Sequence, residues 1–113
     1  MEKIYKIGVI GGGSWATAIV KMLSENIDSI NWWMRNEKAI IHINKYGKNP
    51  NYISNTVLKK EKLVISSDIN SVVENSDLIV LAVPSAFLKL TLGQINLSLD
   101  KKIIISAIKG IVP

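Results

Sequence analysis

Apolar positions along the chain alternate between two spacings. Short runs rich in Ile, Val and Leu predict five strands, at Ile4–Ile10, Ile30–Met34, Leu63–Ser66, Leu78–Val83 and Ile103–Ala107. Apolar residues at helical spacing between these runs predict helices, at Ser14–Asn26, Glu37–Asn44, a short segment around Ile69–Val73, and Ala86–Leu99. Because strands alternate with helices and are apolar throughout, we expect an α/β fold in which helices cover both faces of a doubly wound parallel sheet.

Several boundaries follow from single residues. Ser67 or Asp68 is placed to cap the third helix, and Pro84 disfavours helix in the residue before it and stops the fourth strand. The polar stretch 45–55, with Gly47 and Pro50, is expected to be irregular. In the second helix we expect Ile40, Ile41 and Ile43 to face inward. Gly93 weakens the last helix.

Composition narrows the possible chemistry. The 113 residues are 48% hydrophobic and 20% charged, as in an ordinary folded domain. With no cysteine and one histidine, His42, neither a disulfide framework nor a metal site is expected. The net charge of +5 comes mainly from scattered lysines, which we interpret as compositional bias of the source genome before a nucleic-acid footprint. No uncharged run is long enough to span a membrane, so we expect a cytoplasmic protein.

The most informative motif is a glycine turn directly after the first predicted strand. The sequence fits G-x-G-x-x-G/A, with Gly11, Gly13 and Ala16 at the three small positions, and it opens a predicted helix. Gly11 permits the tight turn, Gly13 lets a pyrophosphate approach the backbone, and Ala16 lets helix and strand pack closely. Amide groups at the helix start would face the phosphates. The motif therefore predicts a Rossmann-type dinucleotide-binding domain, although a turn without a ligand remains an alternative.

Two other phosphate or ester chemistries use similar letters. A P-loop requires a lysine after the glycines, and this chain has Ser14 and Trp15 there. The segment also approximates the nucleophile elbow of α/β-hydrolases, with Ser14 as nucleophile. That elbow requires a downstream histidine, and the single candidate is His42 in a predicted helix. Both alternatives are disfavoured.

The end of the second predicted strand bears on cofactor choice. An acidic residue at this place typically binds the ribose 2′-hydroxyl of NADH, but the chain has Met34, Arg35 and Asn36 before the first carboxylate at Glu37. Arginine suits a 2′-phosphate. We therefore expect NADPH or NADH as cofactor, with NADPH favoured. The alternative is that Arg35 is a solvated side chain at a strand end.

Five segments in order resemble one family. They are residues 10–18, Trp33-Met34-Arg35, Asn51-Tyr52-Ile53, Ala82-Val83-Pro84-Ser85 and residues 107–111. Together they resemble the N-terminal domain of bacterial NAD(P)-dependent glycerol-3-phosphate dehydrogenase along essentially the whole chain. The chain departs from the family pattern at Ala16, where glycine is usual, and in the loop after Tyr52, which lacks the family's Pro and Gly.

The resemblance implies roles for particular residues. Ser14 and Trp15 would meet the dinucleotide phosphates, and Arg35 would lie at the adenosine end. Pro84 and Phe87 would line the nicotinamide side. Lys109 matches a family lysine that lies near both nicotinamide and substrate. A lysine at the carboxyl end of a parallel strand is also placed to point into the ligand crevice. It would hold the phosphate or an oxygen of the substrate.

The resemblance also implies what these residues lack. Residues 1–113 would be the dinucleotide-binding domain, and the acid/base lysine would lie in a helical C-terminal domain absent from them. The parent enzyme would interconvert sn-glycerol 3-phosphate and dihydroxyacetone phosphate by hydride transfer, supplying a phospholipid precursor. It would form a homodimer through that domain. The chain alone is expected to bind cofactor without turnover.

Three alternatives remain open at this stage. The chain could belong to another two-domain reductase, such as a ketopantoate reductase or a hydroxyacid dehydrogenase. It could be a non-catalytic module that senses a dinucleotide. Nucleic-acid binding is a third alternative, but the chain has no interleaved aromatic and basic residues, and we expect no nucleic-acid partner.

Overall fold

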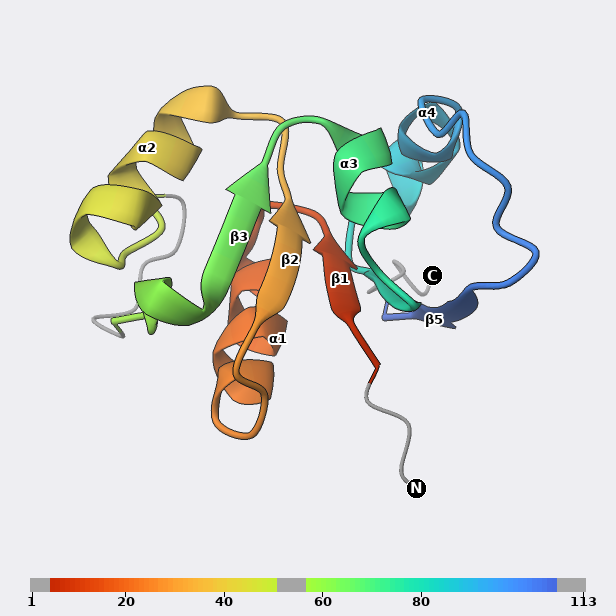
Figure 1. Cartoon of the computed structure of the whole chain (residues 1–113). Helices are drawn as coiled ribbons and strands as arrows, with labels where there is room; N and C mark the ends of the chain where they lie inside the picture. Colours follow the sequence, from red (N-terminus) through yellow and green to blue (C-terminus); the bar gives the residue numbers. More distant parts are fainter. Residues whose placement is uncertain (1–4, 51–56, 108–113) are drawn as a thin grey trace, which may run out of the picture.

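The computed structural model describes residues 5–50 and 57–107, which form one parallel sheet with helices on both faces (Figure 1). The sheet has five strands in the order β3-β2-β1-β4-β5. Their bounds are β1 Ile7–Ile10, β2 Ile30–Trp33, β3 Leu63–Ser66, β4 Leu78–Leu81 and β5 Ile103–Ser106. All four neighbouring pairs are parallel, so the doubly wound parallel sheet is confirmed.

Two pairs of helices cover the two faces of the sheet. The helices are α1 Ser14–Ser24, α2 Glu37–Tyr46, α3 Ile69–Glu74 and α4 Leu88–Leu92, with short 3₁₀ turns at Lys60–Lys62 and Ser85–Phe87. Residues of α1 and α2 share one apolar core with one face of the sheet, and residues of α3 and α4 pack on the other (Figure 1). The chain changes faces between α2 and α3, so the winding reverses beside β1.

Strand register explains why the central strands are almost entirely apolar. Val9 lies beside Trp32 and Val80 on the face that α1 and α2 cover. The next position, Ile10, pairs with Trp33 on the opposite face, which α3 covers. Since successive strand residues point to opposite faces, a strand covered on both must be apolar at every position. This prediction is confirmed for β1 and β4, whereas β2 carries one polar residue, the half-buried Asn31.

The edge strand β5 differs from this expectation. All four of its residues are exposed, with Ile103, Ile104 and Ile105 showing 44, 40 and 46% of their surface. The prediction that every strand is buried on both faces is therefore wrong for β5. Its only neighbour in the described sheet is β4, and no described helix runs along it.

Local signals placed the starts of two helices correctly. Asp68 caps α3, because its Oδ1 accepts hydrogen bonds from the amides of Asn70 and Ser71 at 3.1 and 3.4 Å. The side chain of Asn36 caps α2 in the same way by accepting from the amide of Ala39. At its other end α2 continues to Tyr46, two residues further than predicted. Gly47 then ends it in the left-handed conformation, with φ of 71°.

The helix predicted over Ala86–Leu99 is much shorter in the structure, and α4 ends at Leu92. Asn70 of α3 supplies the reason. Its side-chain amide donates to the carbonyl of Gln94 at 3.1 Å, and its Oδ1 accepts from the amide of Asn96 at 2.7 Å. These bonds satisfy the backbone after Gly93 outside a helix, so the chain need not continue one.

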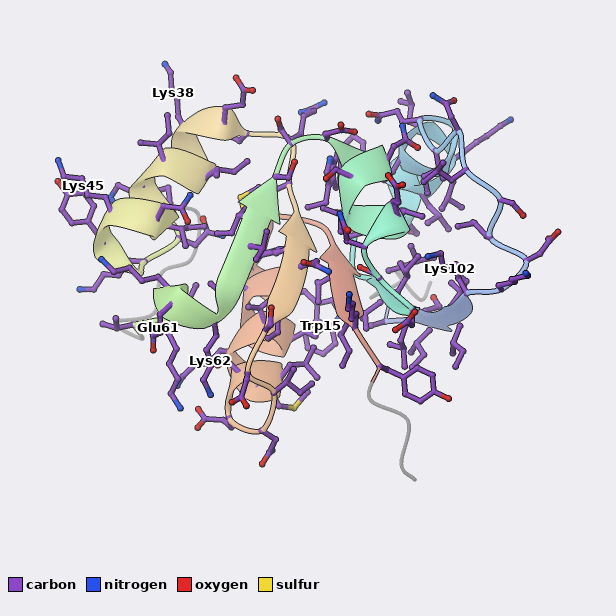
Figure 2. All side chains as sticks on the ribbon, in the orientation of Figure 1. Trp15, Lys38, Lys45, Glu61, Lys62 and Lys102 are labelled. Atoms are coloured by element: carbon purple, nitrogen blue, oxygen red, sulfur yellow. The ribbon has the colours of Figure 1, made fainter. Side chains whose placement is uncertain are left out.

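One inward position was also wrong. Ile41 is 67% exposed, whereas Ala39 and Ile43 are buried against the sheet. Residues 39 and 43 lie on one side of a helix with 3.6 residues per turn, and Ile41 falls on the other. The side chains of Lys38 and Lys45, from the same helix, point away from the sheet (Figure 2).

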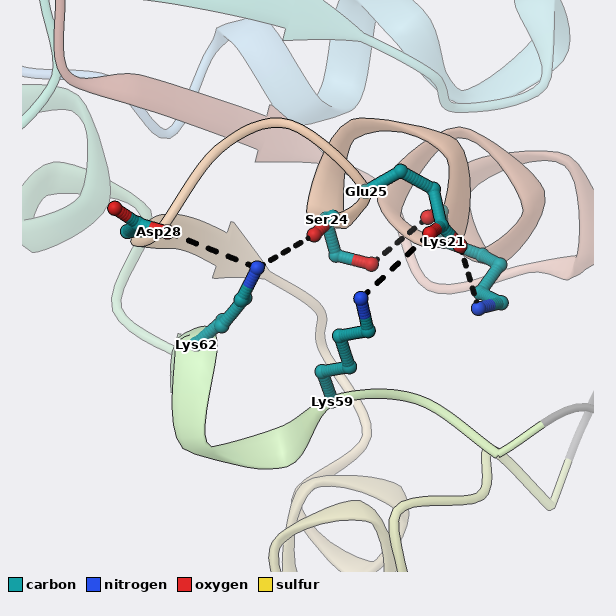
Figure 3. A network of polar contacts seen from close by, with 6 residues as sticks. All are labelled: Lys21, Ser24, Glu25, Asp28, Lys59 and Lys62. Atoms are coloured by element: carbon teal, nitrogen blue, oxygen red, sulfur yellow. Dashed lines mark hydrogen bonds and ion pairs between the residues drawn. The ribbon is translucent and has the colours of Figure 1, made fainter.

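A polar network joins the end of α1 to the segment before β3 (Figure 3). Lys62 donates to the carbonyl of Ser24 at 2.9 Å and lies 3.7 Å from Asp28. Glu25 forms ion pairs with Lys21 at 2.7 Å and with Lys59 at 3.6 Å. The bond and ion pair of Lys21 lower the pKa of the Glu25 carboxyl, and the charge of Lys59 adds to this effect.

Candidate functional site: the glycine turn and the cavity beside it

The turn between β1 and α1 can be built only with glycine at its first two positions. Gly11 has φ of +137°, a conformation that other residues rarely adopt. A Cβ on Gly11 would lie 2.5 Å from the carbonyl oxygen of Ala82 on the neighbouring strand. A Cβ on Gly12 would lie 2.7 Å from the Cβ of Met34. The turn therefore packs against the ends of β4 and β2.

Gly13 has a different environment. A Cβ built on it would meet no atom within 4 Å, and its φ of −85° suits any residue. Neither protein packing nor backbone conformation therefore requires glycine here. A requirement for glycine would come only from something outside the described residues that approaches the backbone closely, such as a bound ligand.

The backbone carbonyls and the backbone amides of the turn differ in their hydrogen bonding. The carbonyls of all three glycines accept hydrogen bonds from interior groups, which are the Trp32 indole, the Asn49 amide and the backbone and hydroxyl of Thr17. In contrast, the amides of Gly12 and Gly13 donate to no acceptor within residues 5–50 and 57–107. The N-terminus of α1 follows directly and has neither a side-chain cap nor an acidic residue in its first turn. Such an end attracts anions.

A cavity of about 360 Å³ opens beside this turn. It lies at the carboxyl ends of the strands, where the winding reverses between β1 and β4, the usual ligand position in such sheets. Its lining comes from the glycine turn, from the end of β2, and from β4 to α4. The lining residues are Gly11–Gly13, Trp33–Asn36, Ala39, Val83, Pro84, Phe87, Leu90, Thr91 and Gln94.

Charge in the cavity is contributed by the end of β2. Arg35 lines the cavity and is exposed, whereas the side chain of Asn36 is engaged in capping α2. The carboxylate of Glu37 accepts a hydrogen bond from the Ser67 hydroxyl at 3.2 Å. No carboxylate is among the described residues that line the cavity, so its charge is positive.

A family model described as the N-terminus of NAD-dependent glycerol-3-phosphate dehydrogenase matches residues 6–113. The chain belongs to this family. The glycerol-3-phosphate dehydrogenase (NAD(P)+) of Syntrophotalea carbinolica is 38% identical over 93% of the chain, and that of Macrococcus caseolyticus is 34% identical over 96%. The chain spans 32% of the length of each of these relatives.

Solved structures agree with this assignment. The glycerol-3-phosphate dehydrogenase of Saccharomyces cerevisiae superposes with a TM-score of 0.79 at 28% identity, over 96% of this chain and 34% of that one. The Coxiella burnetii enzyme gives 0.75 at 25% identity, over 96% and 33%. The resemblance drawn from the sequence is therefore confirmed. Membership of the glycerol-3-phosphate dehydrogenase family also argues against the ketopantoate reductase and hydroxyacid dehydrogenase alternatives.

Within this family member, the structure brings five of the predicted site residues to one cavity. They are Gly11, Gly13, Arg35, Pro84 and Phe87. Phe87 and Arg35 line the same cavity, although the resemblance put them at opposite ends of the cofactor. Phe87 is 55% exposed and, with Leu90 at 72%, forms an apolar wall across from Arg35.

The other predicted residues lie elsewhere. Ser14 is exposed at the first position of α1. Ala16 is fully buried on the side of α1 that packs against the sheet. Trp15 does not line the cavity, because its indole nitrogen donates to the carbonyl of Ala107 just after β5. Lys109 and the segment Asn51-Tyr52-Ile53 lie outside the described residues.

His42, the histidine of the hydrolase alternative, is engaged on α2. Its Nδ1 lies 2.8 Å from the carbonyl oxygen of Lys48, and its ring lies 4.8 Å from that of Tyr46. A carbonyl can only accept, so Nδ1 carries the proton. Neither ring lines the cavity beside the glycine turn. Within the described ranges there is also no group of three residues placed to hold a metal ion, and no helix suited to cross a membrane.

Sequence reasoning missed three residues that hold the turn, namely Thr17, Trp32 and Asn49. The role of Thr17 could have been predicted, because the hydroxyl of a threonine in the first helical turn can donate to the carbonyl four residues before it. Asn49 is 37 residues from Gly12, and no local pattern connects them.

Proposed function

We propose that residues 1–113 are the dinucleotide-binding domain of an NAD(P)-dependent glycerol-3-phosphate dehydrogenase. The observation that carries this proposal is the glycine turn, whose three carbonyls accept hydrogen bonds from interior groups while its glycines line a cavity at the sheet's reversal point. The names of the relatives support NAD(P)H as the cofactor and glycerol 3-phosphate as the substrate. When bound, the nicotinamide would exchange a hydride with C2 of sn-glycerol 3-phosphate or dihydroxyacetone phosphate.

The chain's own residues would bind and orient the cofactor. The amides of Gly12 and Gly13, with the start of α1 at Ser14 and Trp15, are suited to a diphosphate. The open space at Gly13 would let that diphosphate approach the backbone. These residues fit a diphosphate, because the first turn of α1 contains no acidic residue that would repel it.

The adenosine portion would occupy the cavity between β2 and α4. We infer that Phe87 and Pro84 contact this portion from the apolar wall, and that Arg35 contacts it from the opposite side. The volume of about 360 Å³ is within the range of small-molecule pockets. Lys109 keeps its proposed role in binding nicotinamide and substrate.

NADPH is the cofactor we favour. Arg35 would pair with a 2′-phosphate, which NADH lacks. The first carboxylate after Arg35 in the chain, Glu37, accepts a hydrogen bond from Ser67 and is not among the lining residues, so nothing acidic in the described cavity would repel that phosphate. An exposed Arg35 without any ligand contact is the competing interpretation.

Isothermal titration of the 113-residue chain with NADPH and NADH tests both statements. We expect both to bind, with NADPH the tighter of the two, and no turnover of glycerol 3-phosphate. Arg35→Ala should weaken NADPH binding about tenfold and NADH binding much less, because only NADPH presents the extra phosphate. Equal losses for both cofactors would remove the 2′-phosphate role, and absence of binding to either would remove the proposed function.

The remaining assignments concern the longer protein. A catalytic domain following this one, a small phosphorylated substrate, a homodimer formed through that domain and a cytoplasmic location are all parts of the proposal. In the complete enzyme, Lys109→Ala should lower turnover severely while leaving the fold intact, as steady-state kinetics and circular dichroism would show. A non-catalytic sensing role predicts instead that the complete protein binds NADPH and turns nothing over.

A further inference from the structure

Asn49 connects the segment after α2 to the phosphate-facing turn. Its side-chain amide donates to the carbonyl of Gly12 at 3.1 Å and to the hydroxyl of Thr17 at 2.7 Å. Only 4% of Asn49 is exposed, and it is not among the residues that line the cavity. It therefore lies behind the turn, on the side away from a ligand.

The direction of these hydrogen bonds is determined by chemistry. The carbonyl of Gly12 can only accept, so the atom of Asn49 that faces it must be the NH₂ group. The same NH₂ group donates to Thr17, whose own hydrogen is then available for the carbonyl of Gly13, 2.8 Å away. Asn49 thus holds the Gly12 carbonyl directly and supports the Gly13 carbonyl through the Thr17 hydroxyl, beside the Thr17 backbone amide, which donates to the same carbonyl at 3.0 Å.

The geometry of the peptide bond transmits this constraint to the other side of the turn. In a trans peptide the carbonyl of one residue and the amide of the next point in opposite directions. The described chain contains no cis peptide. Holding the carbonyl of Gly12 inward therefore turns the amide of Gly13 outward, and holding that of Gly13 turns the amide of Ser14 outward.

Two hydrogen bonds hold the segment just before Asn49. The Lys48 carbonyl lies 2.8 Å from Nδ1 of His42, and the Gly47 carbonyl accepts from the amide of Leu58 at 2.6 Å. Gly47 takes the left-handed conformation that directs the chain back toward the turn. The side chain of Asn49 is therefore preorganised rather than drawn in by the turn alone.

We propose that Asn49 is a positioning residue for diphosphate binding, acting through Gly12 and Thr17 to aim the amides of Gly13 and Ser14 at the phosphates. The proposal rests on the proposed function, since it needs a diphosphate at the turn. It assigns a binding role to a buried side chain that makes no contact with the ligand.

Ligands with and without phosphates separate this role from a purely structural one. ADP and adenosine are titrated into the 113-residue chain, with binding followed by amide chemical shifts. Asn49→Ala should weaken ADP about tenfold, because the amides lose their fixed orientation, while adenosine binding changes little. The amide signals of Gly13 and Ser14 should shift in the ligand-free variant.

Thr17 supplies a second test that preserves more of the fold. Thr17→Val keeps the shape but removes the hydroxyl relay, so it should weaken ADP in the same selective way. Thr17→Ser restores the hydroxyl and should restore ADP affinity. If Asn49→Ala does not fold, this pair decides the matter, and equal ADP affinity in Thr17→Val and Thr17→Ser overturns the proposal.

Asn31 offers a matched control, because it lies near the amino end of β2, away from the glycine turn at the carboxyl ends of the strands. Its side-chain amide also bridges a carbonyl and a hydroxyl, those of Asn75 at 2.9 Å and Ser76 at 3.3 Å. Asn31→Ala should lower the melting temperature without affecting ADP selectively. If Asn49→Ala reduces ADP and adenosine binding equally, the inference fails and the proposed function stands. If the wild-type chain binds neither ADP nor NADPH, the proposed function fails.

Discussion

Strands β1 and β5 each contain three Ile or Val residues among four, but they lie in opposite kinds of environment. Val9 and Ile10 of β1 are fully buried, whereas three consecutive isoleucines of β5 are 40–46% exposed. β1 is flanked by β2 and β4 and packs against α1 and α3 on its two faces, while β5 has β4 as its one strand neighbour among the described residues. The burial of a strand is therefore set by the number of elements that neighbour it. Its apolar composition alone does not predict that burial.

The same contrast separates the site from the edge of the sheet. The turn after β1 lies where neighbours approach from both sides, so a single added carbon at Gly11 or Gly12 has no room. Close neighbours fix the orientation of its peptides, and a phosphate-binding turn needs that rigidity. The apolar edge at β5 is instead exposed and has one strand neighbour among the described residues.

Gly11→Ala is expected to have the largest effect. The added methyl group would meet the Ala82 carbonyl and force a strained backbone, which should cost roughly 3 kcal/mol or more. Urea denaturation measures this loss, and NADPH titration should show binding abolished. An unfolding free energy close to that of the wild type would mean that the turn is far more plastic than its contacts indicate.

Ile10→Ala and Ile104→Ala compare the two strands directly, because both side chains lie on the face that α3 and α4 cover. Ile10 is 0% exposed, and its truncation should cost about 3 kcal/mol through the cavity it leaves. Ile104 is 40% exposed, and its truncation should cost about 1 kcal/mol or less. Similar losses in urea denaturation would show that something covers β5 in solution.

Gly13→Ala sharpens the comparison within the turn itself. The methyl group meets no described atom and the backbone angles suit alanine, so the free energy of unfolding should not fall. Affinity for NADPH should nevertheless drop about tenfold, because the methyl group occupies the space proposed for the diphosphate. Unchanged affinity in a calorimetric titration would move the phosphates away from Gly13.

The smallest expected effect concerns the exposed network at the start of β3. Lys21 and Lys59 lower the pKa of the Glu25 carboxyl in the folded chain. Its contribution to stability is therefore present above the ordinary value of 4.5 and is lost as the pH falls through the lowered pKa. Glu25→Gln should slightly reduce stability at neutral pH and flatten this acid limb in pH-dependent denaturation. Identical profiles for the two chains would mean that the ion pairs contribute nothing.

Much of the fold could be predicted because its signals are local. Alternating apolar spacings located all five strands, and Asp68 and the glycine turn marked helix starts through bonds to residues close in the chain. The error in the length of α4 came from distant partners, whereas the error at Ile41 came from the helical spacing itself. Asn70 ends α4 through hydrogen bonds to Gln94 and Asn96, which are 24 and 26 positions away. The pattern of residues within 86–99 contains no sign of these bonds.

The sequence alone determined the alternation of strands and helices, the glycine turn and the cation at the end of β2, because each of these signals lies within a few neighbouring residues. Tertiary structure alone decided that β5 lies exposed, that Phe87 and Arg35 share one cavity, and that Trp32, Thr17 and Asn49 hold the three glycine carbonyls. The physical reason is that burial and hydrogen-bond partners across the sheet are set by which segments meet in space, and a linear pattern does not encode those meetings.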